Sequence, residues 1–169
     1  MTKNFFLYFI LLVIAQVLIN EWFTFSPYLT LSILPVLILC MPTKYGPVSS
    51  MFIAFAVGFA VDFLSEGLTG LNILALVPVA AVREMLIRSI FGADPIIRNE
   101  SIPVRKYGSR KVLFALLIVQ SLFLIVYIAA DGAAERNFAF NLARFAVSLA
   151  AGMLLSYFVF DYLTSESKG

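Results

Sequence analysis

Six apolar runs separated by short polar stretches fill most of this chain of 169 residues. A helix needs roughly 20 mostly apolar residues to cross the ~30 Å hydrocarbon core of a membrane. The runs therefore predict six transmembrane helices, over residues 5–22, 28–42, 48–64, 71–90, 112–130 and 138–163. We expect an all-α integral membrane protein, in which a six-transmembrane-helix bundle forms one domain over residues 1–169.

The second run is the least regular of the six. It is short, so five crossings is the alternative count. Pro35 lies inside the predicted helix 28–42 and Pro78 inside the predicted helix 71–90. Both prolines should kink their helices, because proline donates no backbone hydrogen bond.

Composition supports a membrane protein and narrows the chemistry. Hydrophobic residues make up 62% of the chain, and its 13% of charged residues is too little to coat a soluble domain of this size. The single cysteine, Cys40, excludes an internal disulfide, and histidine is absent. No phosphate-binding glycine loop, metal-ligand set or activated serine is recognisable in the sequence. We expect no enzymatic activity, no cofactor and no bound metal.

Basic residues predict the orientation of the helices, because lysine and arginine accumulate on the cytoplasmic side. Residues 83–111 are rich in them, which places both termini and the loop 92–111 in the cytoplasm. The membrane-proximal pair Arg83 and Glu84 should lie at the interface, with its charged ends in water. Topology alone explains the basic loop, and contact with anionic lipid head groups or a docked protein are the alternatives. Its candidate residues are Arg98, Arg105, Lys106, Arg110 and Lys111.

Asp62 is the most informative residue, because a carboxylate inside a membrane-spanning helix requires a partner. At 1.5 Å of rise per residue, Asp62 and Arg144 fall at a similar depth below the outer surface. We predict that they form an ion pair. Four amides join them in one polar layer: Gln16, Asn20, Asn72 and Asn141. This layer either fixes helix register, lines a ligand cavity or supports a groove for a partner helix.

Two further patterns concern helix surfaces. Small residues, such as Ala54 and Gly58, allow close helix approach, for which packing within the chain is the simpler reading than dimerisation. Four phenylalanines at helical spacing are read as lipid-facing or core residues rather than as a binding site: Phe52, Phe55, Phe59 and Phe63.

The segment that runs from Gly58 through Asp62 to Ser65, followed by Gly70 and later by Arg83, resembles the rod-shape-determining protein MreD of bacteria. The likeness covers residues from Phe5 to about Arg88. It implies a non-catalytic scaffold subunit of the cell-elongation complex in the bacterial inner membrane. The implied direct partner is MreC, with MreB, RodA and a class B penicillin-binding transpeptidase in the wider complex. Membrane lipids surround it, and no nucleic acid is expected.

Chains of the MreD type are also similar in fold to the substrate-binding subunits of energy-coupling-factor vitamin transporters. This is the alternative function, and the polar layer would then be the vitamin site. Those subunits usually carry an Ala-x-x-x-Ala face on the first helix, whereas residues 5–19 here contain only Ala15. The short outer loops also provide little material for a lid.

Overall fold

The described part of the chain folds into helices and loops and contains no β-strand. The computed structural model describes residues 2–22, 29–65, 70–92, 108–132 and 137–165. Its helices are α1 (Thr2–Trp22), α2 (Leu34–Cys40), α3 (Pro47–Leu64), α4 (Leu71–Phe91), α7 (Ser109–Gly132) and α8 (Phe138–Ser165).

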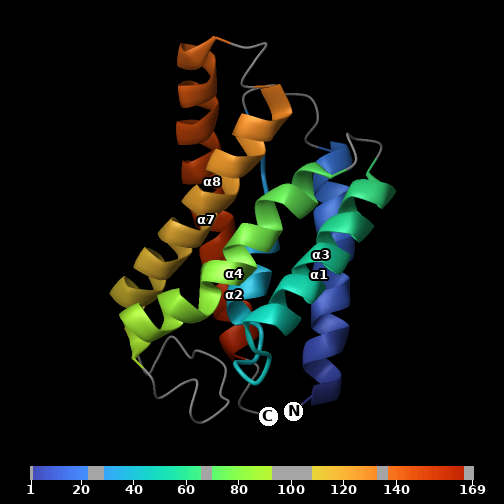
Figure 1. Ribbon diagram of the computed structural model, residues 1–169, viewed down its shortest axis with the longest axis vertical. Coiled ribbons are helices and arrows are strands. Elements are labelled where there is room, and N and C mark those ends of the chain that lie inside the picture. Colours follow the sequence, from blue (N-terminus) through green and yellow to red (C-terminus); the bar gives the residue numbers. More distant parts are fainter. Residues whose placement is uncertain (1, 23–28, 66–69, 93–107, 133–136, 166–169) are drawn as a thin grey trace.

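The bundle is built around the short helix α2. Helix α4 crosses the front of the molecule and packs against α3 on one side and α7 on the other (Figure 1). Helix α7 packs in turn against α8, and α1 contacts α3. Helix α2 contacts α1, α4, α7 and α8, and all of its residues are buried. The first turn of α1 and the last turn of α8 lie at the same end of the molecule (Figure 1).

Glycine and proline set the ends of α3 and α4. Helix α3 begins at Pro47, whose missing N–H is not needed in a first turn, and the Gly46 carbonyl accepts the first bond from the Ser50 N–H at 2.9 Å. Gly70 precedes α4 with a φ of 106°, a conformation that favours glycine. Gly92, with a φ of 86°, ends α4 by donating its N–H to the Arg88 carbonyl.

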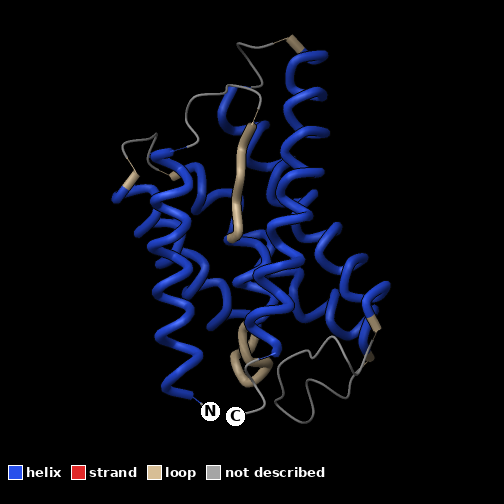
Figure 2. Tube along the Cα trace, turned by 180° about the vertical axis from the view of Figure 1, so that it is seen from behind, coloured by secondary structure: helices blue, strands red, loops and turns tan. Residues whose placement is uncertain are grey.

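The predicted helix 28–42 is wrong over much of its length. Only Leu34–Cys40 is helical. The described residues before it, 29–33, form a nearly straight, extended stretch that ends at Ile33, the N-cap of α2, whose φ of −94° and ψ of −4° are already helical (Figure 2). Pro35 does not kink the helix but lies in its first turn, where proline is tolerated. We call residues 29–40 the interrupted segment. At about 3.3 Å per extended residue and 1.5 Å per helical residue its contour is roughly 25 Å, most of the ~30 Å thickness of the hydrocarbon core.

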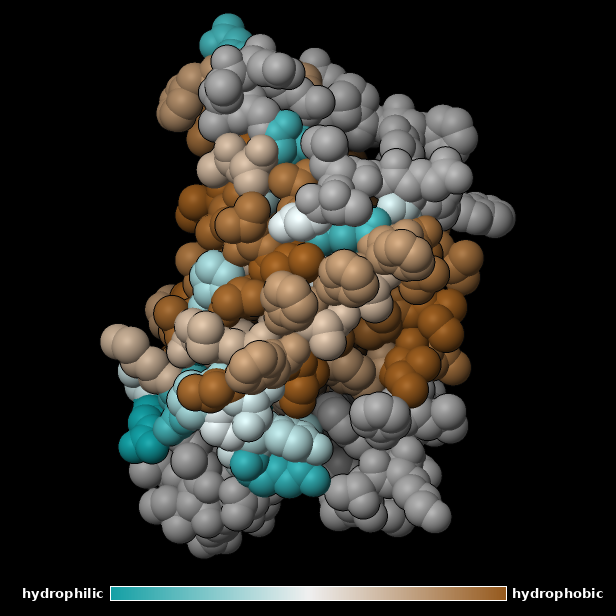
Figure 3. Space-filling view, turned by 45° about the vertical axis from the view of Figure 1, so that its right-hand side comes forward, coloured by the Kyte–Doolittle hydropathy of each residue, from teal (hydrophilic) through white to brown (hydrophobic). Residues whose placement is uncertain are grey.

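Within the described residues, three helices are long and apolar enough to cross a membrane, over Pro47–Leu64, Ser109–Asp131 and Phe138–Phe160, and a shorter apolar helix covers Phe9–Asn20. Hydrophobic side chains cover most of the middle of the face seen in Figure 3, and hydrophilic ones gather near its lower end. The structure is thus consistent with the predicted membrane helical bundle.

One loop boundary also differs from the prediction. Helix α7 already begins at Ser109, so Arg110 and Lys111 are exposed residues of its first turn and not part of a loop 92–111. The remaining candidates of that loop, Arg98, Arg105 and Lys106, lie outside the described residues.

Candidate functional site: a polar core around the interrupted segment

The extended stretch 29–33 runs through the middle of the bundle and continues directly into α2 (Figure 2). Ser32 and Ile33 in this stretch are buried. An extended backbone does not bond to itself as a helix does, and at membrane depth it is tolerated only where protein or water satisfies its polar groups. The surrounding side chains must therefore supply these hydrogen bonds.

Two buried glutamines supply most of them. Gln16 of α1 donates from Nε2 to the Leu31 carbonyl at 3.0 Å and accepts the Ile33 N–H at 2.7 Å through Oε1. Gln120 of α7 donates from Nε2 to the Ser32 carbonyl at 3.2 Å. The two amides approach the extended stretch from different helices and replace the bonds that a helical backbone would make.

The start of the stretch is held by α8, which Asp131 of α7 supports. The Ser148 hydroxyl accepts the Thr30 N–H at 2.8 Å, and the Thr30 hydroxyl accepts Nε of Arg144 at 3.0 Å. Arg144 also forms an ion pair with Asp131 through Nη1.

Asp62 does not form the predicted ion pair with Arg144. Its carboxylate instead accepts hydrogen bonds from the first turn of α4: the Gly70 N–H at 3.0 Å, the Asn72 N–H at 3.2 Å and the Ile73 N–H at 3.3 Å. The Asn72 amide adds a fourth at 2.8 Å. A helix N-terminus offers unpaired N–H groups and a partial positive charge, so α4 satisfies this carboxylate without a cation. Arg144 instead pairs with the carboxylate of Asp131, near the end of α7.

The positions that carry the MreD resemblance share one region of the structure. At Gly58, a β-carbon would lie 2.8 Å from the Cα and N atoms of Ile73, so only glycine allows this approach of α3 to α4. Asp62 caps α4, and Gly70 adopts the positive φ before it. Ser65 accepts the Asn20 amide at 3.3 Å, which links α1 to this unit. The four residues act together to fix the junction of α3 and α4.

The other members of the predicted layer occupy different places. Gln16 connects the two groups described above, because its Nε2 also donates to the Asn20 amide oxygen at 2.7 Å. Asn141 is half-buried, and its backbone N–H donates to the Asn137 carbonyl near the start of α8.

The guanidinium of Arg83 was predicted to reach water beside Glu84, and this is wrong. Arg83 is buried and donates to the Met41 carbonyl, at the C-terminal end of α2, and to the Ser50 hydroxyl. Positive charge is favourable near the unpaired carbonyls of a helix C-terminus, which explains the location. Glu84 instead pairs with Arg88, one turn further along α4.

Sequence reasoning missed several residues of the polar core, among them Gln120, Ser148 and Asp131. Gln120 carried a usable signal, since an amide in the middle of the apolar run 112–130 is as unusual as Asp62 in its own run. A second signal is the four-residue spacing of a buried face on α8. That face consists of Arg144, Ser148, Gly152 and Ser156.

Comparison with known proteins adds no relative: no protein-family model, no curated protein and no solved structure matches this chain. The resemblance to MreD therefore rests on the residues of the chain itself.

Proposed function

We propose that this chain is a non-catalytic membrane scaffold of the MreD type, which binds MreC in the bacterial inner membrane. Through MreC it would support the assembly of MreB, RodA and the class B penicillin-binding transpeptidase during cell elongation. The proposed topology has six crossings and cytoplasmic termini. The contour length of the interrupted segment supports the sixth crossing, because its extended stretch and the short helix α2 together reach most of the way across the core.

The observation that carries the proposal is the construction of α3. Gly58, Asp62 and Ser65 are all used to fix α3 against its neighbours. A separate face of the same helix carries a row of exposed phenylalanines, in which the rings of Phe55 and Phe59 stack at 6.5 Å and those of Phe59 and Phe63 at 6.1 Å. A scaffold needs a rigid outward surface, and this helix combines a fixed position with such a surface.

Occupied polar groups favour a scaffold over ligand capture. Asp62, Gln16 and Gln120 direct their amide and carboxylate groups at backbone atoms of the chain itself. Arg144 is engaged by Asp131 and Thr30. Helix association in lipid relies on van der Waals packing between complementary surfaces, so the ring row of α3 is the face on which the MreC transmembrane helix would pack.

The test is affinity purification of the tagged full chain from its native membrane in mild detergent, with mass spectrometry of proteins and small molecules in the eluate. Recovery of MreC without a stoichiometric small molecule is the expected result. Recovery of ATPase subunits in place of MreC would overturn the proposal.

A variant pair locates the partner surface. Replacing Phe55 and Phe59 by leucine keeps the face apolar, and should lower MreC recovery roughly tenfold if aromatic rings anchor the partner. The control is Phe158→Leu on α8, which is 70% exposed and should leave recovery unchanged. Equal recovery from both variants would exclude this face of α3.

One observation favours the second candidate, a vitamin-binding subunit of an energy-coupling-factor transporter. Interrupted helices form substrate sites in several transporter folds, and residues 29–33 lie beside the charged side chain of Arg144. A vitamin in the same eluate, at a ratio near one per chain, would support this candidate.

A further inference from the structure

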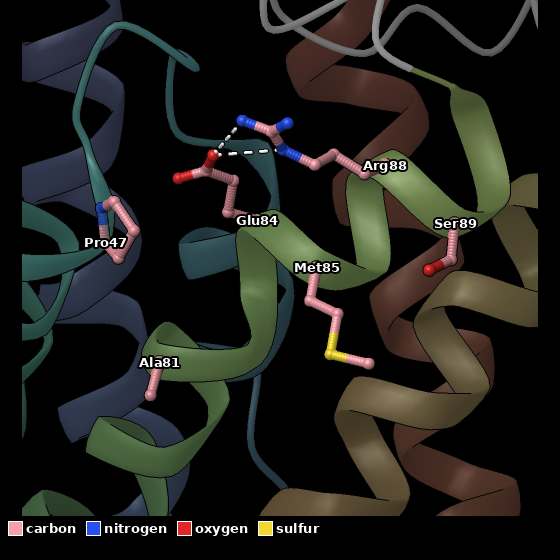
Figure 4. A pocket seen from close by; sticks show the side chains of 6 residues that line it. All are labelled: Pro47, Ala81, Glu84, Met85, Arg88 and Ser89. Atoms are coloured by element: carbon pink, nitrogen blue, oxygen red, sulfur yellow. Dashed lines mark hydrogen bonds and ion pairs between the residues drawn. The ribbon is translucent and has the colours of Figure 1, made fainter.

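A groove on the surface of α3 and α4 combines an apolar part with a pair of opposite charges. It is shallow and open, has a volume of about 490 Å³, and is lined by Pro47, Ala81, Glu84, Met85, Arg88 and Ser89. In Figure 4, Ala81 and Met85 lie on one side of Glu84 and Arg88. Met85 is 71% exposed, so the groove opens on the outer surface of the bundle.

The position of the groove along the helix places it where hydrocarbon meets water. Its apolar residues precede Arg88 and Ser89, and α4 ends at Phe91 just beyond them. A membrane lipid has the same combination of groups, with acyl chains beside a polar head. The occupant that fits this combination is a phospholipid.

The ion pair identifies the head group. Arg88 donates from Nε and Nη2 to a single oxygen of Glu84, Oε1, at 3.1 and 2.6 Å. The other carboxylate oxygen of Glu84 points away from Arg88 toward Pro47 (Figure 4). Both side chains remain partly exposed although they form the ion pair: 58% of the Arg88 side chain and 28% of the Glu84 side chain is accessible. The groove therefore presents one positive and one negative group side by side.

A purely anionic head group would meet repulsion from Glu84, whereas a zwitterionic one matches both charges. Guanidinium binds phosphate through charge-assisted hydrogen bonds, and a carboxylate binds a primary ammonium in the same way. We infer that the groove is a binding site for phosphatidylethanolamine, with its phosphate on Arg88 and Ser89, its ammonium on Glu84, and an acyl chain along Met85 and Ala81. This inference does not depend on the proposed scaffold function.

The decisive comparison is between phosphatidylethanolamine and phosphatidylcholine. Both carry the same charges, but the trimethylammonium group of phosphatidylcholine has no N–H to donate to Glu84. The delipidated full-length protein in detergent is titrated with each lipid, and with phosphatidylglycerol, and the bound fraction is measured by native mass spectrometry. Phosphatidylethanolamine should bind roughly three- to tenfold more tightly than the other two, the effect of one hydrogen bond in a partly exposed site.

Two variants test the assignment of roles. Glu84→Gln should abolish the preference over phosphatidylcholine, because the amide no longer attracts an ammonium ion. Arg88→Gln should weaken binding of all three lipids. An i,i+4 ion pair on a surface contributes little to folding, so both variants should keep the wild-type unfolding temperature.

The control is Lys44→Gln, which removes an exposed positive charge that does not line the groove. It should leave the ratio of the phosphatidylethanolamine and phosphatidylcholine affinities unchanged. The inference is overturned by equal affinity for these two lipids, by a preference that survives Glu84→Gln, or by tighter binding of phosphatidylglycerol.

Discussion

The α3–α4 junction and the interrupted segment are both held by buried polar side chains, but their contacts differ in sequence separation. Asp62 bonds to groups 8 to 11 residues away. Thr30 is bonded to Arg144 and Ser148, which are 114 and 118 residues away, and Ser32 to Gln120, 88 residues away. The α3–α4 junction is formed by residues of one short sequence motif, whereas the interrupted segment depends on helices from both halves of the chain.

Breaking the Asp131–Arg144 pair should have the largest effect, and it acts on the interrupted segment. Arg144→Met removes the ion-pair partner of the mostly buried Asp131 carboxylate and should destabilise the protein by about 3–5 kcal/mol. Adding Asp131→Leu should restore much of the loss, measured by denaturant or thermal unfolding in detergent.

The same measurement separates the two regions through a double-mutant cycle. Asp62→Leu and Arg144→Met should be additive within about 0.5 kcal/mol, because these residues have different partners. A coupling between Asp62 and Arg144 as large as that between Asp131 and Arg144 would restore the ion pair that we predicted from the sequence.

Removing the Gln16 amide tests how far the extended stretch depends on α1. Gln16→Leu leaves the Leu31 carbonyl and the Ile33 N–H without their partner, at a cost of about 2–4 kcal/mol. Hydrogen exchange at the Ile33 amide should accelerate. Leu18→Met, at an exposed position on α1, should change stability by less than about 0.5 kcal/mol. Unchanged protection of Ile33 in Gln16→Leu would contradict the role of this glutamine.

Two glycines provide a matched comparison of the regions. Gly58→Ala forces a β-carbon to 2.8 Å from the backbone of α4, and should cost about 1–3 kcal/mol. Gly152→Ala meets the Gln120 amide nitrogen at 2.5 Å, but this is the end of a flexible side chain. Gly152→Ala should therefore cost less, about 1 kcal/mol, mainly through the displaced hydrogen bond. A larger loss of stability for Gly152→Ala than for Gly58→Ala would show that the polar core around the interrupted segment is stiffer than the α3–α4 junction.

The smallest effect is expected for Ser65→Ala at the edge of the junction. It removes a 3.3 Å hydrogen bond from the Asn20 amide in a half-buried position. The loss should be about 0.5–1 kcal/mol, seen as a small shift in the unfolding midpoint. A loss above that of Gly58→Ala would mean that α1 matters more to the junction than the close contact of α3 and α4.

The sequence predicted regular helices well and irregular backbone poorly. Hydropathy located α3, α4 and α8 to within about two residues, because long apolar runs have one stable form in lipid. It failed at residues 29–33, whose apolar content is compatible with a helix and whose extended form depends on Gln16 and Gln120. Such a contact is invisible without knowledge of which helices are neighbours.

The polar residues were easier to find than their partners. Asp62 and Arg144 stood out as buried charges, and both are buried. We predicted them as a pair because they lie at a similar depth. Depth contains no information about the rotation of each helix around its axis, so it could not identify the correct partners. Asp131 competes with Asp62 for the guanidinium of Arg144, and the first turn of α4 competes with Arg144 for the carboxylate of Asp62. Only the arrangement of the helices decides between these partners.

The extended stretch has a consequence for the order in which the protein is assembled. A helix carries its own hydrogen bonds into lipid and is inserted independently of its neighbours. Residues 29–33 lack this independence, because Gln120 and Ser148, which bond to them, are synthesised much later than the stretch itself. The second segment of the chain therefore reaches its final conformation only after α8 has left the ribosome, which makes its docking a late step in biogenesis.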